Sequence, residues 1–178
     1  FDGKKGRPYQ PNDKINPLNK YGASKASGES SIKVLDNGII LRTSWLYGPF
    51  GSNFVLSMLK LHAIKVKKKE IISVISDQIG SPTNTKGLAL ACWACLKKKG
   101  NHIFHWSDSG CASWYDFAIA IGEFGFKSGL ISKPAEIIPI SAKDYSSNVS
   151  RPYYSVLDCL KSSEHLKLKQ DYWRDALK

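Results

Sequence analysis

Short apolar runs alternate along the chain with longer stretches in which apolar residues recur at helical spacing. Residues 39–41, 71–75 and 103–106 are largely apolar, which is typical of strands buried on both faces of a parallel sheet. A fourth run, residues 137–140, contains a proline and is therefore expected at the edge of a sheet. The pattern predicts four short strands.

Four helices are expected between and around these runs. The first should cover residues 20–35 and the third residues 85–96. Asn53 and Ser113 carry the short polar side chains that cap helix N-termini, and each precedes a segment with helical apolar spacing. Residues 1–20 are rich in Pro, Gly, Asn and Lys and are predicted to be a loop. Helices that alternate with short apolar strands indicate an α/β layer structure with parallel strands.

The composition fits an ordinary globular chain. Its 178 residues are 42% hydrophobic, which suits one domain or one and a half. No run of 18 apolar residues occurs, so no membrane span is predicted.

The net charge of +11 raises the question of a nucleic-acid partner. Lysine runs at 65–69 and 97–99 follow predicted helices, where they would oppose the negative end of the helix dipole. A nucleic-acid surface would interleave basic residues with exposed aromatics or belong to a known module, and neither pattern is visible. No nucleic-acid partner is therefore expected, although the positive charge would attract an anionic substrate.

The chain contains four cysteines: Cys92, Cys95, Cys111 and Cys159. The first two are spaced like half of a metal or redox site. However, Leu88, Cys92, Cys95 and Leu96 also fall at helical spacing, which favours a buried apolar face. No second pair of zinc ligands is suitably placed. This cysteine usage is expected of a protein in a reducing, cytoplasmic compartment.

Tyr21 and Lys25 are four residues apart at the start of the first predicted helix. They should project from one helix face, one turn apart. An ammonium held near a phenol favours the phenolate and lowers the tyrosine pKa from its usual value of about 10. Such a phenol can pass a proton to or from the oxygen of a carbonyl or alcohol. The alternative is an exposed tyrosine beside a solvated lysine.

Seven stretches resemble, in order, the dTDP-4-dehydrorhamnose reductases of the extended short-chain dehydrogenase/reductase superfamily. They are Phe1-Asp-Gly3, Pro17-Leu-Asn-Lys-Tyr-Gly-Ala-Ser-Lys25 with Gly28-Glu29, Arg42-Thr-Ser-Trp-Leu-Tyr-Gly48, Gly51-Ser-Asn-Phe54, Asp77-Gln-Ile-Gly-Ser-Pro-Thr83, Ser113-Trp-Tyr-Asp-Phe-Ala118 and Arg151-Pro-Tyr-Tyr-Ser155. The set spans nearly the whole chain, which makes it far more specific than an isolated Tyr-x-x-x-Lys.

This resemblance implies an α/β fold with a partial Rossmann-like parallel sheet and a small α/β substrate-binding lobe. Residues 1–48 would be the C-terminal part of the nucleotide-binding layer. Residues 49–178 would be mainly the substrate-binding lobe, with one returning strand of the Rossmann layer. The implied reaction is the NADPH- or NADH-dependent reduction of dTDP-4-dehydro-L-rhamnose to dTDP-L-rhamnose, a nucleotide sugar for polysaccharide biosynthesis. A cytoplasmic enzyme is expected, and a homodimer is compatible with the resemblance.

The resemblance also implies roles for individual residues. Tyr21 would protonate the 4-keto oxygen, and Lys25 would hydrogen-bond the nicotinamide ribose and keep the tyrosine pKa low. Trp45 would contact the deoxysugar, or would be only a core aromatic residue after a strand. Asn53 would touch the ligand, cap a helix, or do both. Arg151 would meet a nucleotide phosphate or hold the C-terminal loop in place.

The sequence departs from the family pattern in several ways. No Gly-x-Gly-x-x-Gly turn follows a strand, so the half of the site that binds the cofactor phosphates is expected upstream of Phe1. The chain lacks an initiating Met and is expected to be the C-terminal two-thirds of a reductase, inactive by itself. Some family members bind magnesium through an acidic residue where Lys86 stands here, so magnesium is not expected at that position. Tyr154 replaces a frequent family asparagine.

Other functions remain open at this stage. A related sugar-nucleotide reductase or epimerase would share these motifs. A non-catalytic relative, such as the regulatory subunit of methionine adenosyltransferase, would keep the fold for binding alone. Retention of both Tyr21 and Lys25 favours an enzyme, because a binding module has little need for a tuned phenol.

Overall fold

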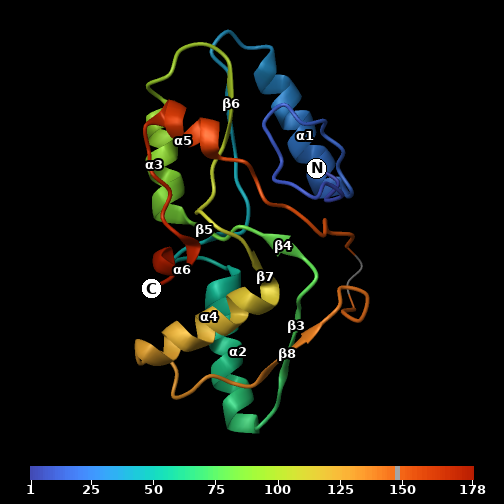
Figure 1. The fold of residues 1–178 in the computed structure, drawn as a ribbon, viewed down its shortest axis with the longest axis vertical. Helices are drawn as coiled ribbons and strands as arrows, with labels where there is room; N and C mark the ends of the chain where they lie inside the picture. The colour runs from blue at the N-terminus through green and yellow to red at the C-terminus, as the bar shows by residue number, and fades with distance from the viewer. Residues whose placement is uncertain (147–148) are drawn as a thin grey trace.

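The computed structural model describes residues 1–146 and 149–178, which form an elongated molecule with an upper and a lower group of elements (Figure 1). The upper group contains α1 (Lys20–Lys33), β1 (Ile39–Arg42), α3 (Thr85–Cys95), β6 (His102–His105) and α5 (Leu160–Leu166). The lower group contains α2 (Phe54–Lys68), β3 (Ile72–Ile75), α4 (Trp114–Lys127) and β8 (Ile137–Ile140). Between them lie β2 (Leu46–Tyr47), β4 (Ile79–Gly80), β5 (Thr83–Asn84), β7 (Ala112–Ser113) and α6 (Trp173–Ala176).

The four predicted strands form two parallel pairs. β1 and β6 are parallel neighbours, with Ile39 opposite His102 and Arg42 opposite His105. β3 and β8 are also parallel, and because this sheet has two strands, β8 is an edge strand, where its proline is tolerated. β2 pairs parallel with β5, whereas β4 pairs antiparallel with β7. The predicted α/β fold with parallel strands is therefore confirmed.

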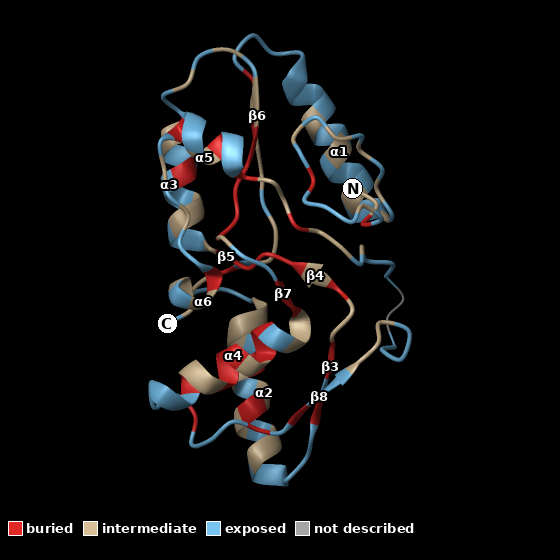
Figure 2. Ribbon diagram, viewed as in Figure 1, coloured by how far each residue is buried: buried red, intermediate tan, exposed pale blue. Residues whose placement is uncertain are grey.

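Each group has its own cluster of buried apolar residues, and Figure 2 marks the buried residues of both groups in red. The upper cluster contains Ala91, Cys95, Phe104, Trp106 and Leu166. In the lower cluster, Phe117 contacts the rings of Trp45, Tyr47, Phe54 and Trp173. α2 and α4 pack against each other, and α4 also packs against β3 and β8.

The predicted caps of α2 and α4 are confirmed. The Asn53 side chain accepts a hydrogen bond from the Leu56 N–H at 3.1 Å. Ser113 and Asp116 form a reciprocal capping box at the start of α4. These local interactions explain why both helices begin where the sequence predicts.

The predicted burial of the α3 face is partly wrong. Cys95 is buried at 5% exposure, but Cys92 is exposed and Leu96 is 73% exposed. Ala91, not Cys92, occupies the upper core. Nearly every residue from 88 to 96 is apolar, so helical spacing alone could not select which side of α3 faces the sheet.

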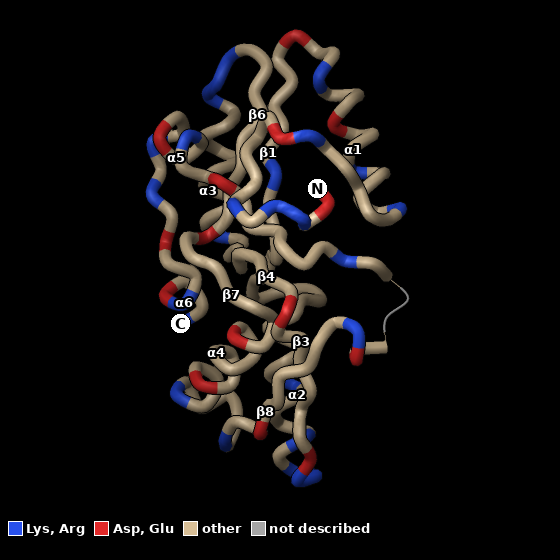
Figure 3. The backbone as a smooth tube through the Cα atoms, turned by 45° about the vertical axis from the view of Figure 1, so that its right-hand side comes forward, with Lys and Arg blue, Asp and Glu red and all other residues tan. Residues whose placement is uncertain are grey.

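The lysine runs follow helix ends, as expected. Lys65, Lys67 and Lys68 lie in the last turn of α2, and Lys69 is its C-cap. Figure 3 shows that basic residues are distributed along the whole backbone, with acidic residues between them. No helix in the described ranges has the length and apolar character needed to cross a bilayer.

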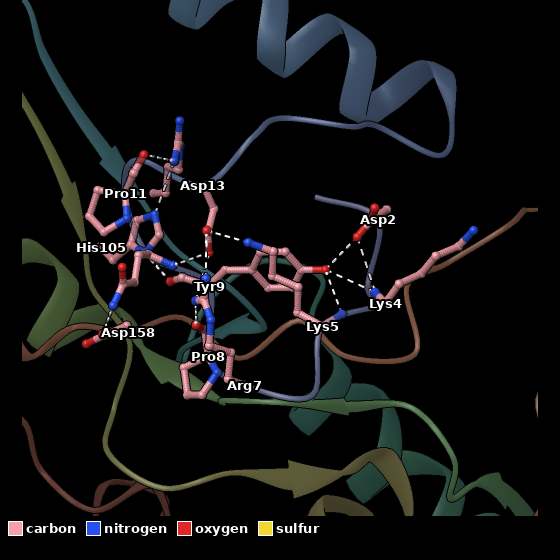
Figure 4. Close-up of polar contacts among 12 residues, drawn as sticks. Asp2, Lys4, Lys5, Arg7, Pro8, Tyr9, Pro11, Asp13, His105 and Asp158 are labelled. Carbon is pink, nitrogen blue, oxygen red and sulfur yellow. Dashed lines mark hydrogen bonds and ion pairs between the residues drawn. The ribbon is translucent and has the colours of Figure 1, made fainter.

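The N-terminal loop, residues 1–19, is fixed by a polar network around Tyr9 (Figure 4). The Tyr9 side chain is 1% exposed, and its hydroxyl donates to Asp2 Oδ1 at 2.6 Å and accepts from the Lys4 N–H at 3.0 Å. The Tyr9 N–H donates to the Val156 carbonyl at 2.9 Å, and the Tyr9 carbonyl accepts from the Asp158 N–H at 2.8 Å. The loop is thereby joined to the C-terminal segment.

His105 connects this loop to β1 and β6. Its Nε2 lies 3.2 Å from Arg42 Nη1, and because a guanidinium can only donate, Nε2 must accept and Nδ1 must carry the proton. Nδ1 then donates to the Tyr9 carbonyl at 2.9 Å. Burial, together with the Arg42 charge, lowers the His105 pKa to about 4.

Acid should therefore destabilise the fold through His105. An unfolded histidine has a pKa of about 6.5, so between that value and about 4 the unfolded chain binds more protons. The contribution of neutral His105 to the free energy of unfolding is fully present above the unfolded pKa. It is lost as pH falls through the folded pKa. We expect the free energy of unfolding to fall by about 2–3 kcal/mol between pH 7.5 and 4.5 because of His105. Urea unfolding of His105→Gln should show a weaker pH dependence than wild type. The exposed-residue control His165→Gln should retain the wild-type dependence, and equal pH dependence in all three proteins would contradict the assignment.

Candidate functional site

Helix α1 presents its side chains on the surface. Asn19 caps it by accepting from the Gly22 N–H at 2.8 Å, and none of its residues is buried (Figure 2). A two-point ion pair holds it against β1, because Arg42 donates to the two carboxylate oxygens of Glu29 at 2.6 and 2.7 Å. Burial acts to raise the Glu29 pKa, but the hydrogen bonds and charge of Arg42 outweigh it, so this pKa is lowered overall.

Tyr21 and Lys25 share one face of α1, as their spacing predicts. Lys25 Nζ lies 5.6 Å from the centre of the Tyr21 ring, and Tyr21 is 72% exposed. Both line a hollow of about 440 Å³, together with Arg42 and Thr43 where β1 ends. The phenol and the ammonium are therefore accessible at the carboxyl end of a parallel strand, where open α/β sheets bind ligands.

A larger cavity of about 500 Å³ adjoins this hollow. Tyr21 lines both of these spaces, whereas Trp45 and Arg151 line the larger cavity and not the hollow beside α1. Residues separated by more than a hundred positions therefore converge on one cavity. The structure brings together three of the five predicted site residues there and places Lys25 beside them.

Trp45 packs in the lower core and also lines the larger cavity. Its indole stacks on Trp114, with ring centres 3.5 Å apart and planes at 5°, and packs against the lower core. It also lines the larger cavity. Trp45 is therefore a core aromatic residue that also borders the cavity, and its contact with a deoxysugar stays a prediction.

Asn53 is placed differently. Besides capping α2, its amide donates to the Gly48 carbonyl at 2.9 Å, and it lines neither of the two spaces described above. Its helix-capping role is confirmed, and a ligand contact stays a prediction.

Arg151 lies where the larger cavity meets a smaller one of about 310 Å³. Gln78 also lines both cavities and is 6% exposed. Among the described residues, neither side chain has a hydrogen bond to another protein group. A cation and a carboxamide are thus free to meet a ligand that extends from one cavity into the other.

Sequence reasoning missed Gln78 and Trp114 as residues of the cavity. Both stand inside stretches that carry the family resemblance, Asp77 to Thr83 and Ser113 to Ala118. Their place inside these stretches could have marked them as cavity residues. The stretches were interpreted only as a loop and a capped helix.

Within residues 1–146 and 149–178, no three His, Cys, Asp or Glu side chains are grouped so that they could hold a metal ion. At the position considered for magnesium, the Lys86 N–H donates to Asn84 Oδ1 at 2.9 Å, which caps α3. Lys86 itself is exposed.

Known proteins resemble this chain along its whole length. A family model described as the RmlD substrate binding domain matches residues 1–178. The chain belongs to the RmlD substrate-binding domain family. This membership confirms the resemblance that the seven sequence stretches carry.

Among the relatives of this RmlD substrate-binding domain, the spore coat polysaccharide biosynthesis protein SpsK of Bacillus subtilis is 41% identical over 179 residues, covering 100% of this chain and 59% of the relative. A dTDP-4-dehydrorhamnose reductase of Aggregatibacter actinomycetemcomitans is 38% identical over 189 residues, covering 100% and 62%. The crystal structure of a dTDP-4-dehydrorhamnose reductase from Bacillus anthracis in complex with NADP superposes with a TM-score of 0.86 at 33% identity, covering 99% of this chain and 60% of that one. The chain thus spans about 60% of the length of these relatives.

Proposed function

We propose that this chain supplies the acid–base pair and most of the sugar-nucleotide pocket for the reduction of dTDP-4-dehydro-L-rhamnose to dTDP-L-rhamnose with NADPH or NADH. The observation that carries the proposal is the convergence of Tyr21, Trp45 and Arg151 on one cavity, with Lys25 beside it. Similarity to dTDP-4-dehydrorhamnose reductases over the whole chain supports the choice of substrate.

Two functional regions are proposed. Residues 1–48 belong to the nucleotide-binding layer, because they contain α1 and β1. Residues 49–178 form mainly the substrate-binding lobe, and β6 returns to pair with β1. The larger cavity receives side chains from both regions.

The hollow beside α1 suits the nicotinamide end of a dinucleotide. Its apolar walls include Ile15, Pro17 and Leu157, and its polar groups include Tyr21 and Lys25. The flat nicotinamide ring could pack against the apolar walls while the ribose hydroxyls lie near the Lys25 ammonium, so the apolar and the polar residues of the hollow would each have a partner. A bound nicotinamide cofactor supplies the hydride in this chemistry.

The residues of this chain handle the proton and the orientation of the substrate. Tyr21 donates its hydroxyl proton to the sugar C4 oxygen as that oxygen gains negative charge. The positive charge of Lys25 stabilises the phenolate that remains. Arg151 provides a guanidinium for a phosphate of the nucleotide, and Trp45 provides an apolar wall for the sugar. The ketone is thereby held with its oxygen at the phenol.

A cytoplasmic location is proposed with this function. The described structure contains four free cysteines, which fits a compartment that keeps thiols reduced. The homodimer that is compatible with the family resemblance is tested separately, by light scattering of the purified chain.

A segment exchange tests the proposed reaction. In the Aggregatibacter reductase, the segment that matches this chain is replaced by residues 1–178, and NADPH oxidation is followed with dTDP-4-dehydro-L-rhamnose. We expect turnover by the hybrid and none by the chain alone, with the parent reductase as positive control. A folded hybrid that binds NADPH and the sugar nucleotide without turnover would overturn the proposal and would favour a binding protein.

A further inference from the structure

The backbone at Trp45 adopts a conformation that is unusual for a large side chain. Its φ angle is +46°, in the left-handed region that non-glycine residues seldom occupy. Such strain persists only where surrounding contacts enforce it, and it is common at ligand sites. At this position the Trp45 carbonyl accepts from the Thr83 N–H at 3.1 Å, which fixes the peptide on its C-terminal side.

The Trp45 ring is fixed as well as its backbone. One indole face is covered by Trp114, the first residue of α4, in a nearly parallel stack. Trp114 is supported in turn by Phe54, whose ring centre lies 4.7 Å away. Because Trp114 occupies one face, a ligand in the cavity can meet only the remaining surface of Trp45.

Gly80 leaves the space that this ring position requires. A Cβ atom at residue 80 would lie about 2.5 Å from Trp45 Nε1 and 2.7 Å from Ser155 Oγ, too close for either contact. Gly80 does not have a positive φ, so the need for glycine here is steric. The antiparallel pairing of β4 with β7 places Gly80 opposite Ala112, two residues before Trp114. The stack and the gap therefore arise from the same strand pair.

We propose that Gly80 and Trp114 are positioning residues that hold the Trp45 indole as a fixed wall of the cavity, against which the hexose ring of the sugar nucleotide binds. The identity of the ligand rests on the proposed function, whereas the fixed stack does not. A wall that is ordered before binding spares the ligand the entropic cost of ordering it. Strain at Trp45 is balanced by the stack, so disturbing either neighbour should release the ring.

The stack is tested first by spectroscopy on the 178-residue chain. Two stacked indoles at this separation should show exciton coupling, seen as two bands of opposite sign from the indole transitions in the circular dichroism spectrum. Trp114→Phe and Trp45→Phe should both lose this signal. Trp93→Phe should keep it, because Trp93 is 68% exposed and lies outside the stack. A signal that survives both stack variants would overturn the fixed arrangement.

The positioning role is tested by Gly80→Ala, with Gly6→Ala as the matched control because a Cβ at Gly6 meets no atom within 4 Å. In the segment-exchange reductase we expect Gly80→Ala to raise KM for the sugar nucleotide about tenfold, equivalent to ~1.4 kcal/mol, with kcat nearly unchanged. Gly6→Ala should match wild type in both constants.

The outcomes separate the two proposals. Loss of the coupled signal in Gly80→Ala with an unchanged KM would overturn the positioning role alone. Absence of turnover in the unsubstituted hybrid would count against the proposed function; binding of dTDP-L-rhamnose to the chain, measured by calorimetry, would then replace KM as the test of positioning. If Gly80→Ala does not fold, Trp114→Phe is compared with Trp93→Phe in the same assays, and equal affinities would again overturn the positioning role.

Discussion

Replacing Tyr21 with phenylalanine should lower kcat of the segment-exchange reductase by a factor of about 10²–10⁴, the usual contribution of a positioned general acid. The substitution removes only the hydroxyl, and the Tyr21 side chain is 72% exposed on a capped helix, so the fold should be unaffected. The loss should fall on kcat more than on KM, because the proton is needed when the oxygen becomes charged and not when the ketone binds. Steady-state oxidation of NADPH measures both constants.

Tyr145→Phe is a suitable control for the Tyr21 variant. Tyr145 is 47% exposed and lines neither the cavity nor the hollow beside α1, so its hydroxyl should be dispensable. If Tyr21→Phe kept more than a tenth of the wild-type kcat, another group or water would have to donate the proton, and the role assigned to Tyr21 would be wrong.

Phe117→Ala should cause the largest loss of stability among single substitutions in the lower group, about 3–5 kcal/mol. Phe117 is 1% exposed and lies among four aromatic rings, with centres 5.5–6.4 Å away. Removing its ring leaves a cavity that the surrounding aromatic side chains cannot fill without leaving their own contacts. Urea denaturation of the 178-residue chain, followed by far-ultraviolet circular dichroism, measures the change in the free energy of unfolding.

The same substitution on the same helix provides the comparison. Phe126 is also on α4 but is 52% exposed, so Phe126→Ala should cost less than about 1 kcal/mol. Similar losses at the two positions would mean that helix propensity, and not burial of Phe117, determines the effect.

Local signals were sufficient to predict most of the longer elements. Asn53 and Ser113 cap their helices through side chains only three residues from the amides that they bind, so the sequence carries the information directly. The two-residue strands and the short helices α5 and α6 were not predicted. They are too short to show a periodicity, and they form because distant segments meet, as Gly80 and Ala112 do in β4 and β7.

The cavity was only partly predictable for the same physical reason. Tyr21 was identified through its spacing from Lys25, and Trp45 and Arg151 through the family resemblance; the fold brings the three to one cavity. Gln78 and Trp114 give no distinctive chemical signal in the sequence. Their place in the cavity depends on how β4 and β7 pair, which spacing along the chain does not determine.

The attachment of α1 has a consequence for the dynamics of the chain. This helix buries no residue, and its contacts with the rest of the chain include the Arg42–Glu29 pair and a 2.8 Å hydrogen bond from the Asn19 amide to the Ser150 carbonyl. A helix with few buried apolar contacts has little protection against local opening. The backbone amides of α1 should therefore exchange with deuterium faster than those of α4, whose residues fill the lower core. The helix that carries Tyr21 should thus open more easily than the helix that fills the lower core, while the rest of the fold stays intact.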